Sequence, residues 1–241
     1  MIFKSKTTAN TPLSKHYLEK QGMNLHLYLI HCARLNLIKK YLPKADMILD
    51  LGGVHSPLYQ MGYPYPFKKM IIVDLPAEQS HELYKDKSIV PDVEPEGGDV
   101  IVKFTNMIDL AEIGDASVDL VWSGQSIEHV SRKDGEKLCQ NVFRVLKKGG
   151  SFCLDTPNRY LTEIHTKPVG GGFINPDHKF EYYTDDLRDL LKMCGFTIKR
   201  KLGLCHMPGS VTEFDYSEFI FNKIISRHLK QSYIQYYHCL K

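Results

Sequence analysis

A short apolar segment that ends in an acid and paired glycines, Met47-Ile-Leu-Asp-Leu-Gly-Gly53, constrains the fold of this chain more than any other feature. An apolar run of this length is typical of a strand buried in a parallel sheet, and the glycines let the backbone turn sharply beside a ligand. A second apolar run ends at Asp74, which lies 74 − 50 = 24 positions after Asp50. An acid at the end of a second strand is placed to hold ribose hydroxyls. The pattern therefore predicts an α/β fold that binds an adenine nucleoside.

The glycine turn narrows the choice of nucleoside. It reads Gly52-Gly53-Val54-His55-Ser56-Pro57, without the later glycines of the Gly-x-Gly-x-x-Gly pattern that places a pyrophosphate on a helix N-terminus. The sequence also has no Walker pattern. A nucleoside without phosphates fits better than NAD or ATP, and S-adenosylmethionine is such a ligand. A NAD-dependent oxidoreductase stays a less favoured alternative.

Five segments in a fixed order indicate a family. They are Leu49-Asp-Leu-Gly52, Ile72-Val-Asp74, Val118-Asp-Leu-Val-Trp122 with Ile127-Glu-His-Val130, Val145-Leu-Lys-Lys-Gly-Gly150, and Tyr183-Thr-Asp-Asp-Leu187 with Cys194-Gly-Phe196. With these segments the chain resembles the class I S-adenosylmethionine-dependent methyltransferases of the small-molecule type, over about residues 45 to 205. Val54 and Ser56 stand where that family usually has two further glycines, which affects the backbone path of the turn but not the expected strand–turn–helix unit.

The resemblance implies a Rossmann-like, doubly wound α/β fold with a seven-stranded, mostly parallel sheet and one antiparallel strand. Residues 1–44 are expected to form an N-terminal helical cap, and residues 45–241 the methyltransferase domain, with an inserted substrate loop over 156–183. The helix within the cap either covers the cofactor or packs on the flank of the sheet. Apolar runs predict strands over 47–51, 70–74, 99–105, 118–123, 151–155, 196–204 and 233–240. Helices are expected over 27–41, from Ser131 to Gly149, from Thr184 to Gly195 and over 218–228, whereas residues 1–13 and 85–98 are expected to be irregular.

The resemblance implies that S-adenosylmethionine is the cofactor. Asp74 is expected to hold the ribose, and Asn106 and Met107, which follow the third strand, are expected to flank the adenine. The remaining predicted cofactor residues lie at the ends of the first, second and fourth strands: Asp50, Gly52, Gly53, Leu75, Ser123, Gly124 and Gln125.

Two histidines are candidate general bases, because methyl transfer to a hydroxyl requires removal of its proton near the transition state. His129 follows the fourth strand and His178 lies in the predicted substrate loop. Each has a plainer interpretation, as a residue that orients the loop or as a solvated loop residue, and Glu128 or Asp177 is an alternative base. Asn158, Arg159 and Asp177 are predicted to contact the acceptor. No metal site is predicted, because the sequence does not identify a third ligand to join Asp177 and His178.

The favoured function is O-methylation of a small molecule or a sugar. N- or C-methylation, or methylation of RNA or protein, stays open, as does a non-catalytic nucleoside-binding module. A net charge of +3 without a basic stripe argues against a nucleic-acid partner, and no apolar stretch approaches the ~18 residues of a membrane span. Six scattered cysteines and the lack of a secretory signal favour the cytoplasm. A homodimer stays open.

Overall fold

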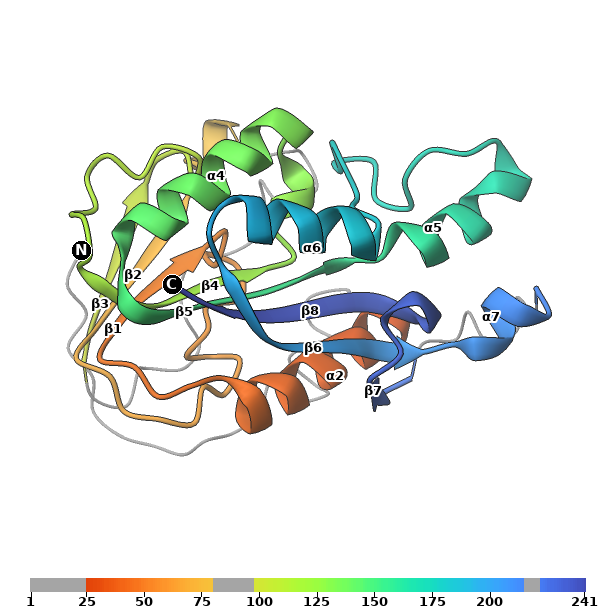
Figure 1. Ribbon diagram of the computed structural model, residues 1–241, viewed down its shortest axis with the longest axis horizontal. Helices are drawn as coiled ribbons and strands as arrows, with labels where there is room; N and C mark the ends of the chain where they lie inside the picture. The colour runs from red at the N-terminus through yellow and green to blue at the C-terminus, as the bar shows by residue number, and fades with distance from the viewer. Residues whose placement is uncertain (1–24, 80–97, 215–221) are drawn as a thin grey trace.

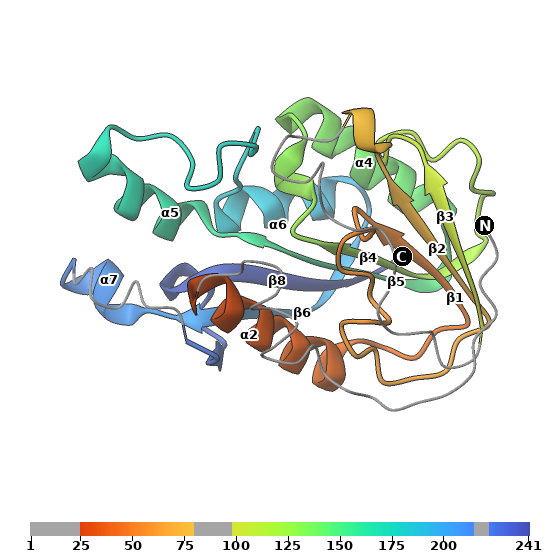
Figure 2. The ribbon, with the colours of Figure 1, turned by 180° about the vertical axis from the view of Figure 1, so that it is seen from behind.

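The computed structural model describes residues 25–79, 98–214 and 222–241 of the chain. A single twisted sheet crosses the molecule, with α4 and α6 on one face and α2 on the other (Figure 1). The view from behind shows α2 lying along β6 and β8 (Figure 2). The predictions for residues 1–13 and 85–97, and for the first part of the 218–228 helix, lie outside the described residues.

The sheet has the order β3-β2-β1-β4-β5-β8-β6-β7. Strands β1 to β5 run parallel to one another, whereas β8 is antiparallel to both β5 and β6, and β7 is antiparallel to β6. This confirms the predicted fold class. The strands are β1 Met47–Leu51, β2 Lys69–Asp74, β3 Asp99–Phe104, β4 Val118–Gly124, β5 Leu146–Pro157, β6 Thr197–His206, β7 Ile225–Ser226 and β8 Ser232–Leu240.

The strand count differs from the prediction because β7 adds an eighth strand at the edge of the sheet. It falls within the predicted 218–228 helix, and residues 222–228 of that segment contain no helix. Leu204 of β6 pairs with Ile225 of β7, so Ile225 extends the sheet instead of belonging to a helical stripe.

Two apolar clusters hold the helices against the sheet. One contains alternate strand residues, such as Ile48 and Leu120, together with Leu37 and Ile38 of α2; the other contains their strand neighbours and the buried face of α4 and α6. This alternation is the period of two that a sheet covered on both faces requires. The helices are α2 Leu25–Tyr41, α4 Arg132–Val145, α5 Arg159–Thr166, α6 Thr184–Met193 and α7 Pro208–Thr212, with short 3₁₀ turns η1 Ala77–Gln79, η2 Ile127–His129, η3 Lys167–Val169 and η5 Leu229–Gln231.

Helix α4 begins as predicted and ends earlier. The Ser131 hydroxyl accepts a hydrogen bond from the Asp134 amide and caps the helix. The helix stops at Val145 because Leu146 already pairs with Val118 of β4, so the segment that includes Gly149 belongs to β5. No described helix is both long and apolar enough to cross a membrane.

Two connections differ from the expected ones. Residues 52–68, between β1 and β2, form successive turns without an α-helix, so the predicted strand–turn–helix unit is wrong here. Pro57, Pro64 and Pro66 lack an amide hydrogen, which disfavours a regular helix in this segment. Residues 156–183 are not a continuous loop, because they include α5 and η3.

Candidate active site

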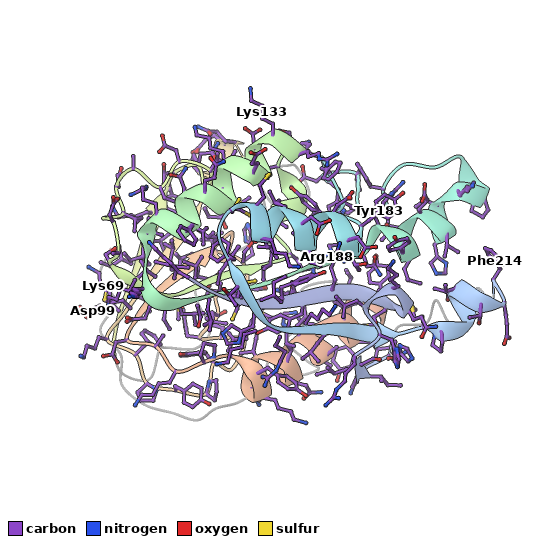
Figure 3. All side chains as sticks on the ribbon, viewed as in Figure 1. Lys69, Asp99, Lys133, Tyr183, Arg188 and Phe214 are labelled. Atoms are coloured by element: carbon purple, nitrogen blue, oxygen red, sulfur yellow. The ribbon has the colours of Figure 1, made fainter. Side chains whose placement is uncertain are left out.

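The carboxyl ends of the central strands form the candidate site. Strand order reverses between β1 and β4, and ligands of open α/β sheets bind outside the strand ends at such a point. Lys69 and Asp99, labelled in Figure 3, mark the opposite end of the sheet, where β2 and β3 begin. The predicted cofactor residues from β1, β2 and β4 therefore lie at one edge.

A buried carboxylate shapes the glycine turn. The side chain of Asp50 accepts a hydrogen bond from the Leu58 amide at 2.7 Å, and Asp50 is 1% exposed. A Cβ atom on Gly53 would overlap this carboxylate, so only glycine fits at that position. Burial raises the pKa of Asp50 to about 7, although the Leu58 amide opposes the shift. The buried Asp50 carboxylate therefore stabilises the turn through its hydrogen bond to the Leu58 amide.

Asp74 ties the same turn to β2. Its Oδ2 atom accepts from the Val54 amide at 3.0 Å, and its Oδ1 atom accepts from the Leu75 amide at 2.8 Å. The residue is half-buried, and burial raises its pKa while the two amides lower it. Because a carboxylate oxygen can accept two hydrogen bonds, each oxygen keeps the capacity to accept one more.

The segment after β4 has a strained backbone. Gln125 adopts a φ of 56°, in the left-handed region that non-glycine residues rarely occupy. Its amide and its Nε2 atom donate to the carbonyl and the carboxylate of Asp155, each at 2.9 Å. Ser126 donates from Oγ to the Leu51 carbonyl at 2.7 Å. The Oγ atom of Ser123 is buried and has no hydrogen-bond partner among the described residues. The hydrogen bonds of Gln125 and Ser126 join the ends of β1, β4 and β5.

Sequence analysis missed a buried ion pair at this edge. The Nε atom of Arg34, on α2, lies 2.8 Å from Oδ2 of Asp155, and their side chains are 9% and 0% exposed. The guanidinium also lies 6.0 Å from the Trp122 ring centre, and a Cβ atom on Gly124 would overlap it. Two signals were present in the sequence: a cation within the apolar stripe of a helix, and an acid at the end of the fifth strand.

The predicted adenine residues lie after β3. Asn106 is exposed, and its Oδ1 atom accepts from the Ile108 amide at 2.9 Å. Met107 is half-buried and packs against the cluster that includes α4. Their contact with adenine stays a prediction.

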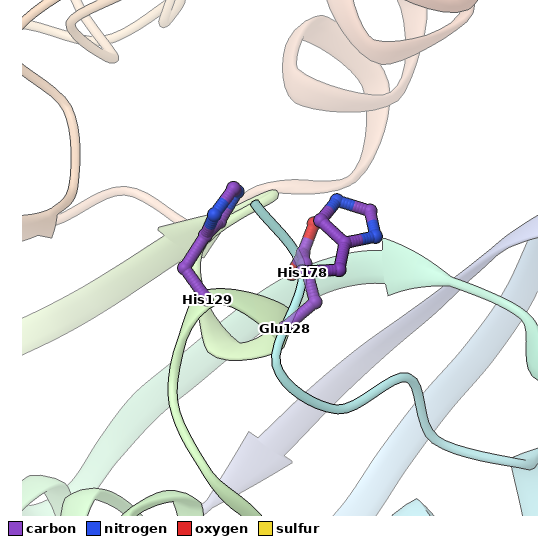
Figure 4. Close-up of side chains that lie close together, drawn as sticks. All are labelled: Glu128, His129 and His178. Atoms are coloured by element: carbon purple, nitrogen blue, oxygen red, sulfur yellow. The ribbon is translucent and has the colours of Figure 1, made fainter. Parts of the chain in front are cut away.

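The two candidate histidines lie beside each other, and each contacts a carboxylate. The Nδ1 atom of His129 lies 2.7 Å from Asp177, and that of His178 lies 2.6 Å from Glu181. The two rings meet edge to face with centres 5.0 Å apart. Glu128 completes the group, because one ligand atom from each of Glu128, His129 and His178 lies within 4.8 Å of the other two (Figure 4). This group includes His178 but not Asp177, so it differs from the pair of Asp177 and His178 that the sequence analysis considered.

The charges of this group influence one another. Burial alone would lower the pKa of His178, but the hydrogen bond to Glu181 and the charges of Glu128 and Asp177 raise it overall. Burial raises the pKa of Glu128, against the opposing effect of the two histidines. Such mutual shifts are typical of functional sites.

Known proteins share both the fold and part of the sequence. Residues 52–154 match a methyltransferase domain family. A probable S-adenosylmethionine-dependent methyltransferase of Mycolicibacterium smegmatis is 35% identical over 124 residues, which are 52% of this chain. Both matches bear out the resemblance to the class I S-adenosylmethionine-dependent methyltransferases. This confirms the predicted family and its cofactor, S-adenosylmethionine.

Solved structures agree with the fold of this chain. A structure from Thermotoga maritima, described as a possible histamine N-methyltransferase, has a TM-score of 0.60 at 18% identity and covers 90% of this chain and 91% of its own. A small RNA methyltransferase has a TM-score of 0.57 at 16% identity and covers 98% of this chain but 27% of its own. The chain spans about half the length, 46%, of the curated Mycolicibacterium relative.

The described residues of the chain fit S-adenosylmethionine. Asp74 is partly exposed at the end of β2 with acceptor capacity for a ribose diol, and Gly52 and Gly53 of the turn carry no side chains of their own. Asp50 is less suited to direct contact, because its carboxylate is buried beneath Gly53.

One predicted acceptor contact, Asn158, needs correction, whereas that of Arg159 stays a prediction. Asn158 is fully buried: its Nδ2 atom donates to the carbonyls of Leu229 and Ser232, and its Oδ1 atom caps α5 at Tyr160. Asn158 is therefore a structural residue. Arg159 donates to the Gly172 carbonyl and to Glu181, at 2.8 and 3.4 Å, so its charge is used within the 156–183 segment. Asp177 reaches the site through His129.

Proposed function

We propose that the chain transfers a methyl group from S-adenosylmethionine to an oxygen atom of a small molecule or a sugar. The observation that carries the proposal is the group of Glu128, His129 and His178 at the end of β4, next to the predicted cofactor turn. A hydroxyl is a weak nucleophile until its proton leaves, and histidines supported by carboxylates are suited to promote that loss.

The residues at the ends of β1 and β2 would hold the cofactor. Asp74 would accept hydrogen bonds from the ribose, Gly52 and Gly53 would allow the backbone to approach, and Asn106 with Met107 would border the adenine. When bound, S-adenosylmethionine supplies a methyl group on a cationic sulfur: an O–C bond forms, the S–C bond breaks with its electrons left on sulfur, and the hydroxyl proton is released.

The acceptor would bind between η2 and the segment before α6. This segment is fixed there, because the amides of Lys179 and Phe180 donate to the Glu128 carbonyl at 2.8 and 3.1 Å. His129 or His178 would then face the acceptor hydroxyl as general base. Binding two reactants in line supplies much of the rate enhancement of a displacement reaction.

The acceptor class is supported by the histidine group and not by the fold. The similar structures are described as a possible histamine N-methyltransferase and a small RNA methyltransferase, so the fold alone does not select an acceptor. The small net charge of +3 gives no reason to prefer a nucleic-acid acceptor to a small molecule. None of the six cysteines forms a disulfide bond, which is consistent with a cytoplasmic reaction.

Calorimetry with S-adenosylhomocysteine tests the cofactor half of this proposal. Asp74→Ala should weaken binding by roughly 5- to 150-fold, since two hydroxyls lose their acceptor at about 1–3 kcal/mol. Asp99→Ala, at the far end of the sheet (Figure 3), is the matched control and should bind as the wild type does. Equal affinity of the wild type and Asp74→Ala would remove Asp74 from the site.

Labelled S-adenosylmethionine tests the acceptor half. Wild-type protein is incubated with pools of hydroxyl compounds and of amines, and the products are identified by mass spectrometry. The proposal expects methyl ethers from the hydroxyl pool. Methylated amines alone would show an N-methyltransferase, and cofactor binding without any product would favour the non-catalytic module.

A further inference from the structure

We propose that Glu128, His129 and His178 bind a divalent metal ion, which holds the oxygen atom of the acceptor. The binding of the ion stands on the geometry of these residues alone. Its part in the reaction rests on the proposed function. The three residues come from η2 and from the segment before α6, and their side chains extend into a common space (Figure 4).

Buried Glu128 is the first argument for a cation. The residue is 1% exposed, and its Oε2 atom accepts from the Thr156 hydroxyl at 2.9 Å. Its Oε1 atom is buried and has no hydrogen-bond partner among the described residues. A buried carboxylate oxygen without a donor is costly, and a cation shared with two imidazoles would offset that cost.

The hydrogen bonds of the histidines are the second argument. Asp177 and Glu181 are carboxylates, so each accepts the proton of a histidine Nδ1 atom, at 2.7 and 2.6 Å. This tautomer makes Nε2 the ligating atom. A carboxylate behind each histidine is the usual arrangement around a metal ion, where it fixes the ring and increases its basicity.

The supporting carboxylates are themselves held in place. Glu181 is 2% exposed, accepts from the hydroxyl of Thr162 and lies 3.4 Å from the Arg159 guanidinium. The backbone amide of Asp177 donates to the Oδ1 atom of Asn175 at 3.0 Å, which fixes the backbone at Asp177. The site is therefore ordered before any ligand binds, which lowers the entropic cost of binding an ion.

The ligand set indicates the class of ion. Two imidazoles and one carboxylate suit first-row divalent ions such as Zn²⁺, Fe²⁺ and Mn²⁺ better than Mg²⁺, which prefers oxygen ligands. Three protein ligands leave coordination positions open, as in catalytic sites. An acceptor hydroxyl in an open position would lose its proton to the solvent more readily. The histidines would then act as ligands and not as bases.

Calorimetry without cofactor tests the site. Wild-type protein, freed of metal by a chelator, is titrated with Mn²⁺, Zn²⁺ and Mg²⁺. We expect one site per chain that binds Mn²⁺ or Zn²⁺ more tightly than Mg²⁺. Glu128→Gln should abolish or weaken this binding by at least 10-fold. Asp177→Asn, at a more exposed carboxylate, should weaken it by about 10- to 100-fold, with folding of both variants checked by circular dichroism.

His228→Ala is the matched control, because His206 and His228 form a second histidine pair with ring centres 5.7 Å apart. The variant should bind the ion as the wild type does; loss of binding here would assign the ion to that pair and overturn the proposal. Wild type that binds neither Mn²⁺ nor Zn²⁺, or unchanged affinity in Glu128→Gln and Asp177→Asn, would also overturn it.

Methyl transfer separates this inference from the proposed function. Metal-free protein should bind S-adenosylhomocysteine but lose turnover, and added Mn²⁺ or Zn²⁺ should restore turnover. Full turnover without metal would overturn the role of the ion and leave the histidines as bases. If the protein binds the metal ion but does not bind S-adenosylhomocysteine, the metal site is supported and the proposed function is overturned.

Discussion

The buried pair of Arg34 and Asp155 should contribute far more to stability than a surface pair of the same length. Arg34→Met removes the charge and retains an apolar stem, which leaves the fully buried Asp155 carboxylate with Gln125 as its side-chain donor. Removing one partner of a buried pair costs about 3–5 kcal/mol. Coulomb's law gives a consistent value of about 4 kcal/mol for charges about 4 Å apart at an effective dielectric constant near 20. This is a large part of a total stability of about 5–15 kcal/mol.

Arg188→Met is the matched control, because it removes the same group at the same distance in a different environment. Arg188 lies 2.8 Å from Asp185, but the two side chains are 35% and 40% exposed. Exposed pairs contribute about 0–1 kcal/mol. Urea unfolding followed by circular dichroism measures both variants under one set of conditions. The reasoning predicts a much lower midpoint for Arg34→Met and a nearly unchanged midpoint for Arg188→Met.

A double variant separates the lost pair from the lost volume. Asp155→Asn in the Arg34→Met background leaves no charge in this position and keeps an acceptor for Gln125, so it should recover most of the lost stability. If Arg34→Met costs no more than Arg188→Met, or if the double variant is no more stable than Arg34→Met, the destabilisation does not come from a buried, unpaired charge.

Four further substitutions test three glycine positions and the buried carboxylate of Asp50. Gly149→Ala should lower the free energy of unfolding by about 1 kcal/mol, because Gly149 has a φ of 77° and open space around it. Gly52→Ala should lower it by about 2–3 kcal/mol and weaken S-adenosylhomocysteine binding. Gly52 has a φ of 72°, and its Cβ would in addition lie 2.8 Å from the Ser126 hydroxyl. Equal costs would show that the close approach does not matter. Burial raises the pKa of Asp50 to about 7, above its value in the unfolded chain, so the folded state binds the proton more tightly. The stability that proton binding contributes is therefore lost as the pH rises from about 4 through 7. Between pH 5 and 8 the wild type should lose roughly 2–3 kcal/mol relative to Asp50→Asn in urea unfolding, and parallel pH profiles would contradict the assignment. Gly124→Ala should destabilise the wild type by about 1–3 kcal/mol, because its Cβ would overlap Arg34, and by less in the Arg34→Met background.

The strands could be predicted because their signal is local. Strand β1 has the predicted bounds, and β2 and β8 differ from theirs by one residue, since a strand covered on both faces needs only a short apolar run. For the described residues 222–228, the helix prediction was wrong for the opposite reason. A few apolar residues fit a helical stripe or a sheet edge equally well, and pairing with β6 decides between them.

The cofactor edge was predicted in position and only partly in role. Asp50 and Asp74 both end strands, so the sequence treats them alike, but their surroundings differ. Asp50 is buried beneath Gly53, whereas Asp74 is half-buried and faces the turn. Burial of a side chain depends on the path of the following residues, and residues 52–68 lack the expected helix.

The histidine group shows most clearly where a single sequence stops being informative. His129 and His178 lie 178 − 129 = 49 positions apart, and neither has the spacing of a metal motif. Backbone hydrogen bonds from Lys179 and Phe180 to the Glu128 carbonyl bring the two segments together. These bonds use backbone groups that every residue except proline possesses, so no residue pattern records them. Each histidine taken alone is compatible with a base or a bystander. Only their joint position, with Glu128 buried between them and a carboxylate behind each ring, favours a bound cation.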